Sequence, residues 1–304
     1  MMRIGMMIGE GAGETPTLDE IVARAQRIEA AGLSSGWMAN IFAYDAINTL
    51  GIVGRETKRI ELGTAVVPTY PRHPYAMAQQ ALTTQVASGG RFTLGIGLSH
   101  QVVIEKMLGL SYARRISHMK EYLAVLKPLL HGEPIKYRGE EYRVNLELKP
   151  PGATPVPIIM AALGPQMLAL CGRETTGTLT WMAGHKALKE HVVPRITTAA
   201  RGAGRPAPRV IAGMPIAIAN DTTKACDVAA KVFAIYRDLP AYRTMLDREG
   251  AAEPVDVALV GDVATVKEEI QRLEDIGVTD LCAFVFHAEP GAFERTIDFL
   301  ASLV

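Results

Sequence analysis

Two histidines, His73 and His100, stand where predicted strands give way to loops, and either could move a proton. His73 lies in "LGTAVVPTYPRHP", Leu62–Pro74, where a small β-branched strand runs into three prolines and hydrogen-bonding side chains. His100 ends "GIGLSH", after another apolar run. An imidazole ordinarily titrates near neutrality, so each can serve as a general acid or base. Tyr70 and Arg72 share the proline loop, and we expect them to line a substrate pocket.

For either histidine alone, the competing interpretation is a loop residue hydrogen-bonded to backbone. His287 ends a predicted strand but is isolated. Four others fall in helical or surface segments, where we expect them to be solvated: His118, His131, His185 and His191. The chain lacks an HExxH motif, a cysteine–histidine cluster, a GxSxG elbow and a Walker A motif. We therefore predict no metal site and a chemistry supplied by an organic cofactor.

A third candidate is the stretch "AALGPQM". Small residues precede a proline here, and proline suits the first position of a helix. The free N–H groups of a helix start attract anions, so a phosphate site is expected. A plain tight turn between strand and helix is the alternative. The residues concerned are Ala161, Ala162, Leu163, Gly164 and Pro165.

These residues need elements to position them, and short apolar runs alternate with amphipathic helical patterns along almost the whole chain. Thr17 and Glu20 form a capping box before the first helix, and Asp262 can cap a late one. The pattern predicts a (β/α)8 barrel, an α/β fold whose active site lies at the strand ends. An open doubly wound sheet is the alternative, but "GEGAGE" lacks the GxGxxG spacing. The predicted strands are Arg3–Ile8, Ser35–Met38, Ile60–Val67, Phe92–Gly97, Pro157–Ala161, Thr178–Trp181, Val210–Ala219 and Asp280–Phe286.

One segment, about 132–156, breaks this rhythm. Within it Ile135–Val144 is typical of a hairpin, since Tyr137 and Tyr142 flank a turn. We interpret the segment as an insertion after the fourth strand of a single barrel domain spanning residues 1–304.

The amino-acid composition limits the classes of partner that the protein is expected to bind. Lysine plus arginine and aspartate plus glutamate both number 32, so no basic field indicates a nucleic acid partner. No apolar run approaches the roughly 20 residues of a membrane span. Cys171, Cys226 and Cys282 form neither a CxxC pair nor an even disulfide framework, which favours a reducing, cytoplasmic location. The expected partner is a small-molecule substrate.

The ordered motifs resemble a known family. They are "RAQRIEAAGLSSGWMAN", "RIELGTAVVPTYPRHP", "SGGRFTLGIG", "GEPIKYRGEEYRV", "PIIMAALGPQM" and "VALVGDVATVKEEIQRLEDIGVTD". Together they are similar to the bacterial-luciferase-like flavin and deazaflavin oxidoreductases, and most of all to the branch that uses the deazaflavin coenzyme F420. The resemblance implies a barrel with an insertion region, a cofactor at the carboxyl ends of the strands, and a homodimer.

The resemblance also implies roles for single residues. Asn40, where many members read Ser-Asp-His, would hydrogen-bond the cofactor ring. Thr64, Ala65 and Val66 would support that ring, with a cis peptide bond between Ala65 and Val66. Trp181, at a later strand end, would contact the cofactor.

The phosphate loop of the family matches Ala161–Pro165, which strengthens the phosphate site. His100 occupies the place of a glutamate in the family's glucose-6-phosphate dehydrogenases, and the strand-two histidine is also absent, so glucose 6-phosphate is not the expected substrate. The implied reaction transfers a hydride between coenzyme F420 and a small organic substrate, with His100, or less directly His73, handling a proton. Two alternatives stay open: an FMN-dependent monooxygenase, and a flavin- or deazaflavin-binding protein without turnover.

Overall fold

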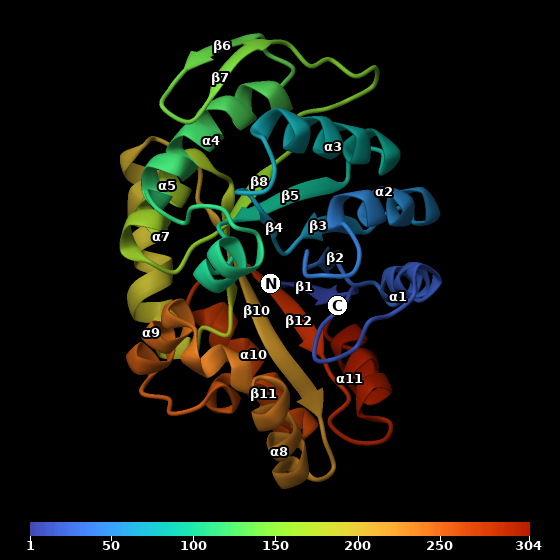
Figure 1. The fold of residues 1–304 in the computed structure, drawn as a ribbon. Coiled ribbons are helices and arrows are strands. Elements are labelled where there is room, and N and C mark those ends of the chain that lie inside the picture. The colour runs from blue at the N-terminus through green and yellow to red at the C-terminus, as the bar shows by residue number, and fades with distance from the viewer.

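Eight parallel strands close into a barrel in this computed structural model, which describes all residues 1–304 (Figure 1). The ring closes because β12 pairs with both β1 and β10, and β10 pairs with β9. This confirms the predicted (β/α)8 barrel and contradicts the open-sheet alternative. The ring strands are β1 (Arg3–Met7), β2 (Ser35–Met38), β3 (Glu61–Thr64) continued by β4 (Val67–Pro68), β5 (Phe92–Gly97), β8 (Ile158–Ala161), β9 (Gly177–Trp181), β10 (Arg209–Ile218) and β12 (Asp280–Val285).

The third strand differs from its prediction. A single strand over Ile60–Val67 was expected, but the ladder is interrupted between β3 and β4, where the Ala65–Val66 peptide bond is cis, as the resemblance implied. Pro68 pairs with Gly97 of β5, although a proline has no N–H to donate to a ladder. The reason is that Thr69 N–H, and not the proline, donates to the carbonyl of Gly97 at 2.9 Å.

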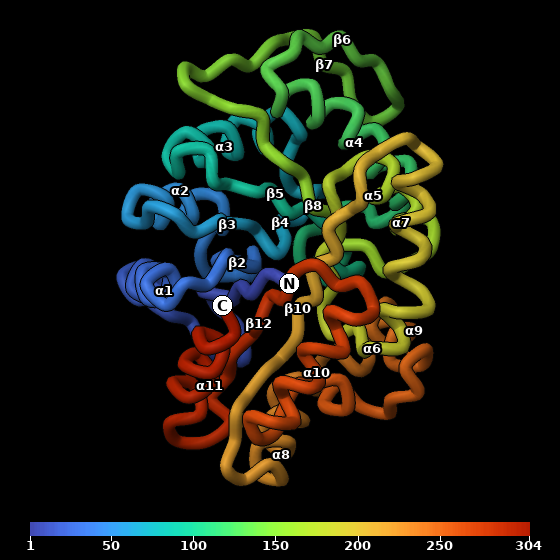
Figure 2. Tube along the Cα trace, turned by 180° about the vertical axis from the view of Figure 1, so that it is seen from behind, coloured from blue at the N-terminus to red at the C-terminus, as the bar shows by residue number.

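Helices surround the barrel, and the two chain ends lie near each other in both views (Figures 1 and 2). The Thr17–Glu20 capping box and the Asp262 cap are both present. None of the helices is both long and apolar enough to cross a bilayer. The α-helices are α1 (Leu18–Ala30), α2 (Ala46–Glu56), α3 (Pro74–Ala87), α4 (Arg115–Leu130), α5 (Pro165–Glu174), α6 (His185–Ala187), α7 (Val193–Gly202), α8 (Thr222–Val232), α9 (Pro240–Glu249), α10 (Val263–Asp275) and α11 (Ala292–Ala301), and the π- and 3-10 turns are η1 (Val102–Met107), η2 (Leu188–Val192), η3 (Ala234–Asp238) and η4 (Pro254–Val257).

Two further elements stand outside the ring. The predicted hairpin is present as β6 (Ile135–Arg138) and β7 (Arg143–Leu146), which pair only with each other and lie at the top of Figure 1. The short strand β11 (Leu259–Gly261) pairs with the outer half of β10, and the sequence analysis did not predict it.

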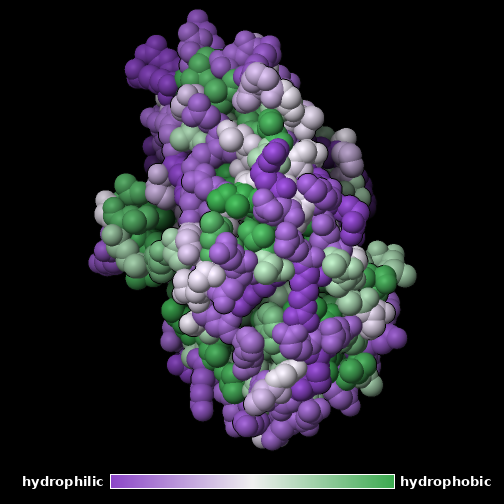
Figure 3. All heavy atoms as spheres, turned by 90° about the vertical axis from the view of Figure 1, so that its right-hand side faces the viewer, coloured by the Kyte–Doolittle hydropathy of each residue, from purple (hydrophilic) through white to green (hydrophobic).

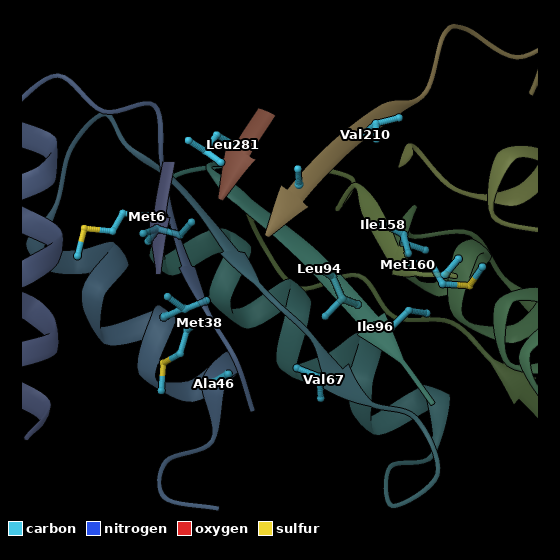
Figure 4. Packing of buried hydrophobic residues seen from close by; sticks show 14 of the residues in the cluster. Met6, Met38, Ala46, Val67, Leu94, Ile96, Ile158, Met160, Val210 and Leu281 are labelled. Atoms are coloured by element: carbon cyan, nitrogen blue, oxygen red, sulfur yellow. The ribbon is translucent and has the colours of Figure 1, made fainter. Parts of the chain in front are cut away.

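The barrel strands bury both faces, and the two faces have different partners. Side chains that point outward, such as Met6, Leu94 and Met160, join a cluster of 63 buried residues between strands and helices (Figure 4). Those that point inward form a small separate cluster of Trp37, Ile159, Leu179, Ile211 and Cys282. Because side chains alternate along a strand, the residue two positions beyond each inward one also points inward, nearer the carboxyl end.

Candidate active site at the mouth of the barrel

The last inward-facing residues before the strands end form the floor of the barrel mouth. Five strands contribute only alanine or glycine there, whereas β1, β9 and β12 contribute Met7, Trp181 and Phe284. The alanines, Met7 and Trp181 remain partly exposed. Four of the small residues lie at the ends of the adjacent strands β2, β3, β5 and β8, so an open half of the floor faces a half with large side chains. The fifth, on β10, lies between Trp181 and Phe284. The small residues are Ala39, Ala65, Gly97, Ala161 and Gly213.

Helix α5 begins beside the small half with its amide groups free. Its N-cap is Gly164, which supplies no side-chain cap, and Pro165 is the first helical residue, as predicted. The amides of Gln166 and Met167 bond to no protein group, and a Cβ atom added at Gly164 would meet nothing within 4 Å. Open space in front of unpaired N–H groups is what an anion needs, so a phosphate fits this site.

Asn40 lies at the end of β2, where its side chain has both used and free atoms. Its Oδ1 accepts from the Ala46 amide at 3.1 Å and from Arg72 at 3.3 Å, which leaves the amide nitrogen as a donor. Arg72 also pairs with Asp45 at 2.5 Å. Arg72 thus holds two loops together. This structural role is an alternative to the substrate contact that the sequence predicts.

Like Ala162, Thr64 is a predicted cofactor residue that the structure places outside the mouth. Its side chain is fully buried, donates to the Gly95 carbonyl at 2.8 Å and accepts from the Gly95 amide at 2.7 Å. It points to the outer face because Gly63 and Ala65 point inward. Thr64 therefore fastens β3 to β5 and has no atom left for a cofactor. Ala162 is buried on the same outer face.

His100 reaches the mouth with a free imidazole. No hydrogen bond of its side chain is formed within the protein, and its ring lies 5.7 Å from that of Tyr242. Burial lowers its pKa from the ordinary 6.5, because a charged imidazole loses hydration there. His100 is therefore neutral at pH 7 and is available to accept a proton.

His73, the other predicted proton carrier, has a structural role. Its Nδ1 accepts the Tyr75 amide at 3.1 Å and caps α3, and its ring packs edge-on against Tyr142. The side chain is exposed on the outside of the loop. The competing interpretation, a backbone-bonded loop histidine, therefore describes His73.

Charges gather at the opposite end of the barrel. Arg209 bonds Glu61 at 2.8 Å and Asp280 at 2.5 Å, and Arg3 bonds the same two carboxylates. An open hollow of about 370 Å³ lies beside them, also lined by Glu274. It is at the amino-terminal end, where conserved features of such barrels serve stability and not catalysis. All four charges of the cluster are paired, so we assign this end to the fold.

Comparison with known proteins agrees with this location of the site. The family model of luciferase-like monooxygenases matches residues 2–280. This chain belongs to that family. It is 29% identical over 294 residues to the 5,10-methylenetetrahydromethanopterin reductase of Methanolobus tindarius, which is 87% of this chain and 89% of that protein.

Two further similar proteins have names that include coenzyme F420. The F420-dependent hydroxymycolic acid dehydrogenase of Mycobacterium tuberculosis is 30% identical over 203 residues, 62% of this chain and 55% of that protein. Among solved structures, the coenzyme F420 dependent tetrahydromethanopterin reductase of Methanopyrus kandleri superposes with a TM-score of 0.85 over 100% of this chain and 98% of its own, at 23% identity. The chain is thus a luciferase-like oxidoreductase with the barrel of that family.

In this luciferase-like barrel, His118 is buried, which corrects the prediction that it is solvated. Its Nδ1–H donates to the Glu141 carboxylate at 2.6 Å, its Nε2 lies 2.9 Å from the Thr69 hydroxyl, and its ring stacks on Tyr70 at 4.1 Å. The prediction failed because Glu141 comes from the inserted hairpin, which packs on α4. Tyr70 is consequently tied to α4, and its hydroxyl donates to the Ala113 carbonyl.

His191 is also buried and not solvated. Its Nε2–H donates to the Leu163 carbonyl at 2.7 Å, and its Nδ1 has no partner. Burial lowers its pKa, chiefly because the charged form would be desolvated. His191 thereby holds the loop that precedes α5, a role that only the tertiary contact with η2 reveals.

Proposed function

We propose that this chain is an oxidoreductase that binds coenzyme F420 at the mouth of the barrel and transfers a hydride between it and a small organic substrate. The observation that carries the proposal is the pairing of a small-residue floor with the open amino end of α5, within a family that includes relatives named as F420-dependent. A flat ring suits the first, and a phosphate suits the second.

Different residues of the chain would bind the phosphate, bind the ring and transfer the proton. The free amides at the start of α5 would bind the phosphate, and Ala65, Val66 and Ala161 would carry the ring. The Asn40 amide is a donor for its polar edge, and the Trp181 ring would contact the cofactor from the side. Bound F420 supplies a carbon that takes up or releases a hydride. His100 would accept or return the accompanying proton.

The phosphate contact can be tested at Gly164. Its φ of −76° suits any residue and no atom lies near its Cβ position, so Gly164→Asp and Gly164→Ala should both fold. An aspartate N-cap stabilises a helix by about 1 kcal/mol but places a negative charge where the phosphate belongs. We expect Gly164→Asp to raise the melting temperature and to weaken F420 binding at least about tenfold, whereas Gly164→Ala leaves binding within about threefold.

Binding is followed by the fluorescence of the deazaflavin and stability by thermal unfolding. If the two variants bind F420 with equal affinity, the phosphate does not bind at the start of α5. This outcome would leave the barrel and its ring-binding floor to be tested separately.

A further inference from the structure

The large half of the mouth continues outward as four aromatic side chains, which we call the aromatic wall: Trp181, Tyr236, Tyr242 and Phe284. Neighbouring rings touch in order. The ring centroids are 5.6 Å apart for Phe284 and Trp181, 5.8 Å for Trp181 and Tyr236, and 5.1 Å for Tyr236 and Tyr242. His100 then follows Tyr242 at 5.7 Å. The wall thus leads from the floor of the mouth to the free imidazole of His100.

The wall carries hydrogen-bond donors that the protein leaves unused. Trp181 Nε1 is buried and has no acceptor at good hydrogen-bonding geometry, although the Tyr236 hydroxyl lies close enough to interact with it. Neither the Tyr236 nor the Tyr242 hydroxyl bonds to any protein group. Buried donors are rarely left unpaired in folded proteins. Here Trp181 Nε1 is such a buried donor, so a ligand is expected to supply its acceptor. The Tyr236 and Tyr242 side chains are partly exposed, so their hydroxyls are open to solvent and available to the same ligand.

The wall also carries no charge. Burial raises the pKa of both Tyr236 and Tyr242, so their hydroxyls stay protonated, and it lowers the pKa of His100. Charged side chains of the same segment are engaged elsewhere. Arg237 pairs with Glu253, and Arg243 donates to the carbonyls of Ala251 and Ala252. Near Phe284, Arg24 and Glu14 pair with each other at 3.4 Å. A charged ligand group on the wall would therefore lose its hydration and gain no unpaired counter-ion.

We propose that the substrate of this oxidoreductase is an uncharged organic compound whose apolar body packs on the aromatic wall and whose oxygen accepts hydrogen bonds from Trp181, Tyr236 and Tyr242. This inference rests on the proposed function, because it takes the cofactor to occupy the small half and leaves the large half for the substrate. Trp181 lies where the two halves meet, so it can contact both. The wall excludes carboxylate, phosphate and ammonium groups from the buried end of the substrate.

The test uses two probes that share one skeleton. 1-Phenylethanol is uncharged, and 4-(1-hydroxyethyl)benzoate adds only a carboxylate. Each is titrated into the full-length protein, with and without bound F420, and tryptophan fluorescence is followed. The chain has two tryptophans, of which Trp37 is sealed inside the barrel, so the signal reports on Trp181. We expect the alcohol to bind at least about tenfold more tightly than the benzoate.

A double variant, Tyr236→Phe with Tyr242→Phe, keeps the rings and removes the two hydroxyls. We expect it to bind F420 as the natural protein does and to weaken 1-phenylethanol about tenfold. The matched control is Tyr137→Phe on the hairpin, which should change neither affinity. Equal or tighter binding of the benzoate, no binding of the alcohol, or an unchanged double variant would overturn the inference.

The two proposals fail separately. If F420 does not bind but the probe preference persists without it, the cofactor assignment falls and the wall's preference stands. If F420 binds and the benzoate is preferred, the cofactor assignment stands and the substrate class is wrong.

Discussion

At the scale of single residues, His100 and His73 differ in one respect that decides their roles. Both follow strands in the sequence, and both were predicted to handle protons. The Nδ1 of His73 accepts a hydrogen bond that caps α3, whereas both ring nitrogens of His100 are free beside the mouth. A general base needs an unoccupied nitrogen within reach of the substrate. Our proposal therefore assigns the proton transfer to His100.

The first prediction concerns His100→Gln. We expect turnover to fall by about 10²- to 10⁴-fold while F420 affinity is kept, because a general base is lost and the ring-binding floor is not. Burial lowers the pKa of His100 below 6.5, so the neutral, proton-accepting form is present at pH 7 and is lost as the pH falls through the lowered value. Oxidation of substrate by the natural protein should therefore decline on the acid side, and this limb should vanish in His100→Gln.

The control is His73→Ala. It should lose about 1 kcal/mol of unfolding free energy, because a helix cap is removed, and should keep its turnover within about twofold. The pH profile of turnover and urea unfolding measure the two effects. A large loss of turnover in His73→Ala with His100→Gln active would reverse the assignment.

At the scale of elements, the inserted hairpin is fastened to the barrel through α4. Glu121 on α4 accepts the amides of Glu140 and Glu141 at 3.0 Å each, and Glu141 bonds His118, which lies against Thr69 beyond β4. The chain of contacts thus runs from the hairpin to the strand that carries the cis peptide bond.

The second prediction is that Glu141→Ala lowers the free energy of unfolding by about 1–3 kcal/mol, because a buried Nδ1–H of His118 loses its acceptor. Its neighbour offers a matched control. Glu140 pairs with Arg114 at the surface, with both side chains more than half exposed, so Glu140→Ala should cost at most about 0.5 kcal/mol. Urea unfolding compares the two, and equal losses would show that the His118 contact does not hold the hairpin.

Sequence patterns located most elements because their signals are local. Alternation, capping and proline position were enough for the strands, for the Thr17 cap and for the start of α5. The outward direction of Thr64 was also readable, since Glu61 and Gly63 alternate with Leu62 and Thr64. The burial of His118 and His191 was not, because their partners, Glu141 and the Leu163 carbonyl, lie 23 and 28 residues away.

At the scale of the whole molecule, the two ends of the barrel differ in the side chains that line them. Paired charges close the amino end, Trp37 fills the middle, and the mouth is small on one side and aromatic on the other. The resemblance named residues for the small side, of which Asn40, Ala65 and Ala161 lie at the mouth and Thr64 does not. It did not predict Tyr236 and Tyr242, which come from η3 and α9, a segment with no motif to carry them.

The surface near the mouth has an apolar projection. The segment after β5 exposes Val102, Met107, Leu108 and Leu110, and Figure 3 shows apolar side chains that project at the left edge of that view. The segment is anchored by buried Ile104 and by the Tyr112 hydroxyl, which donates to the Ser99 carbonyl at 2.8 Å. These anchors lie next to His100, so the segment's position and that of the imidazole are set together.

The measurement that tests the account most directly is a titration of the purified protein with coenzyme F420 and, separately, with FMN, followed by cofactor fluorescence. Both carry a tricyclic ring and a phosphate, so the comparison asks which ring the mouth accepts. The account predicts that F420 binds with a Kd of about 1 μM or tighter, which corresponds to about 8 kcal/mol, and that FMN binds far more weakly. Tighter binding of FMN would move the protein to flavin monooxygenase chemistry, and binding of neither would contradict the site.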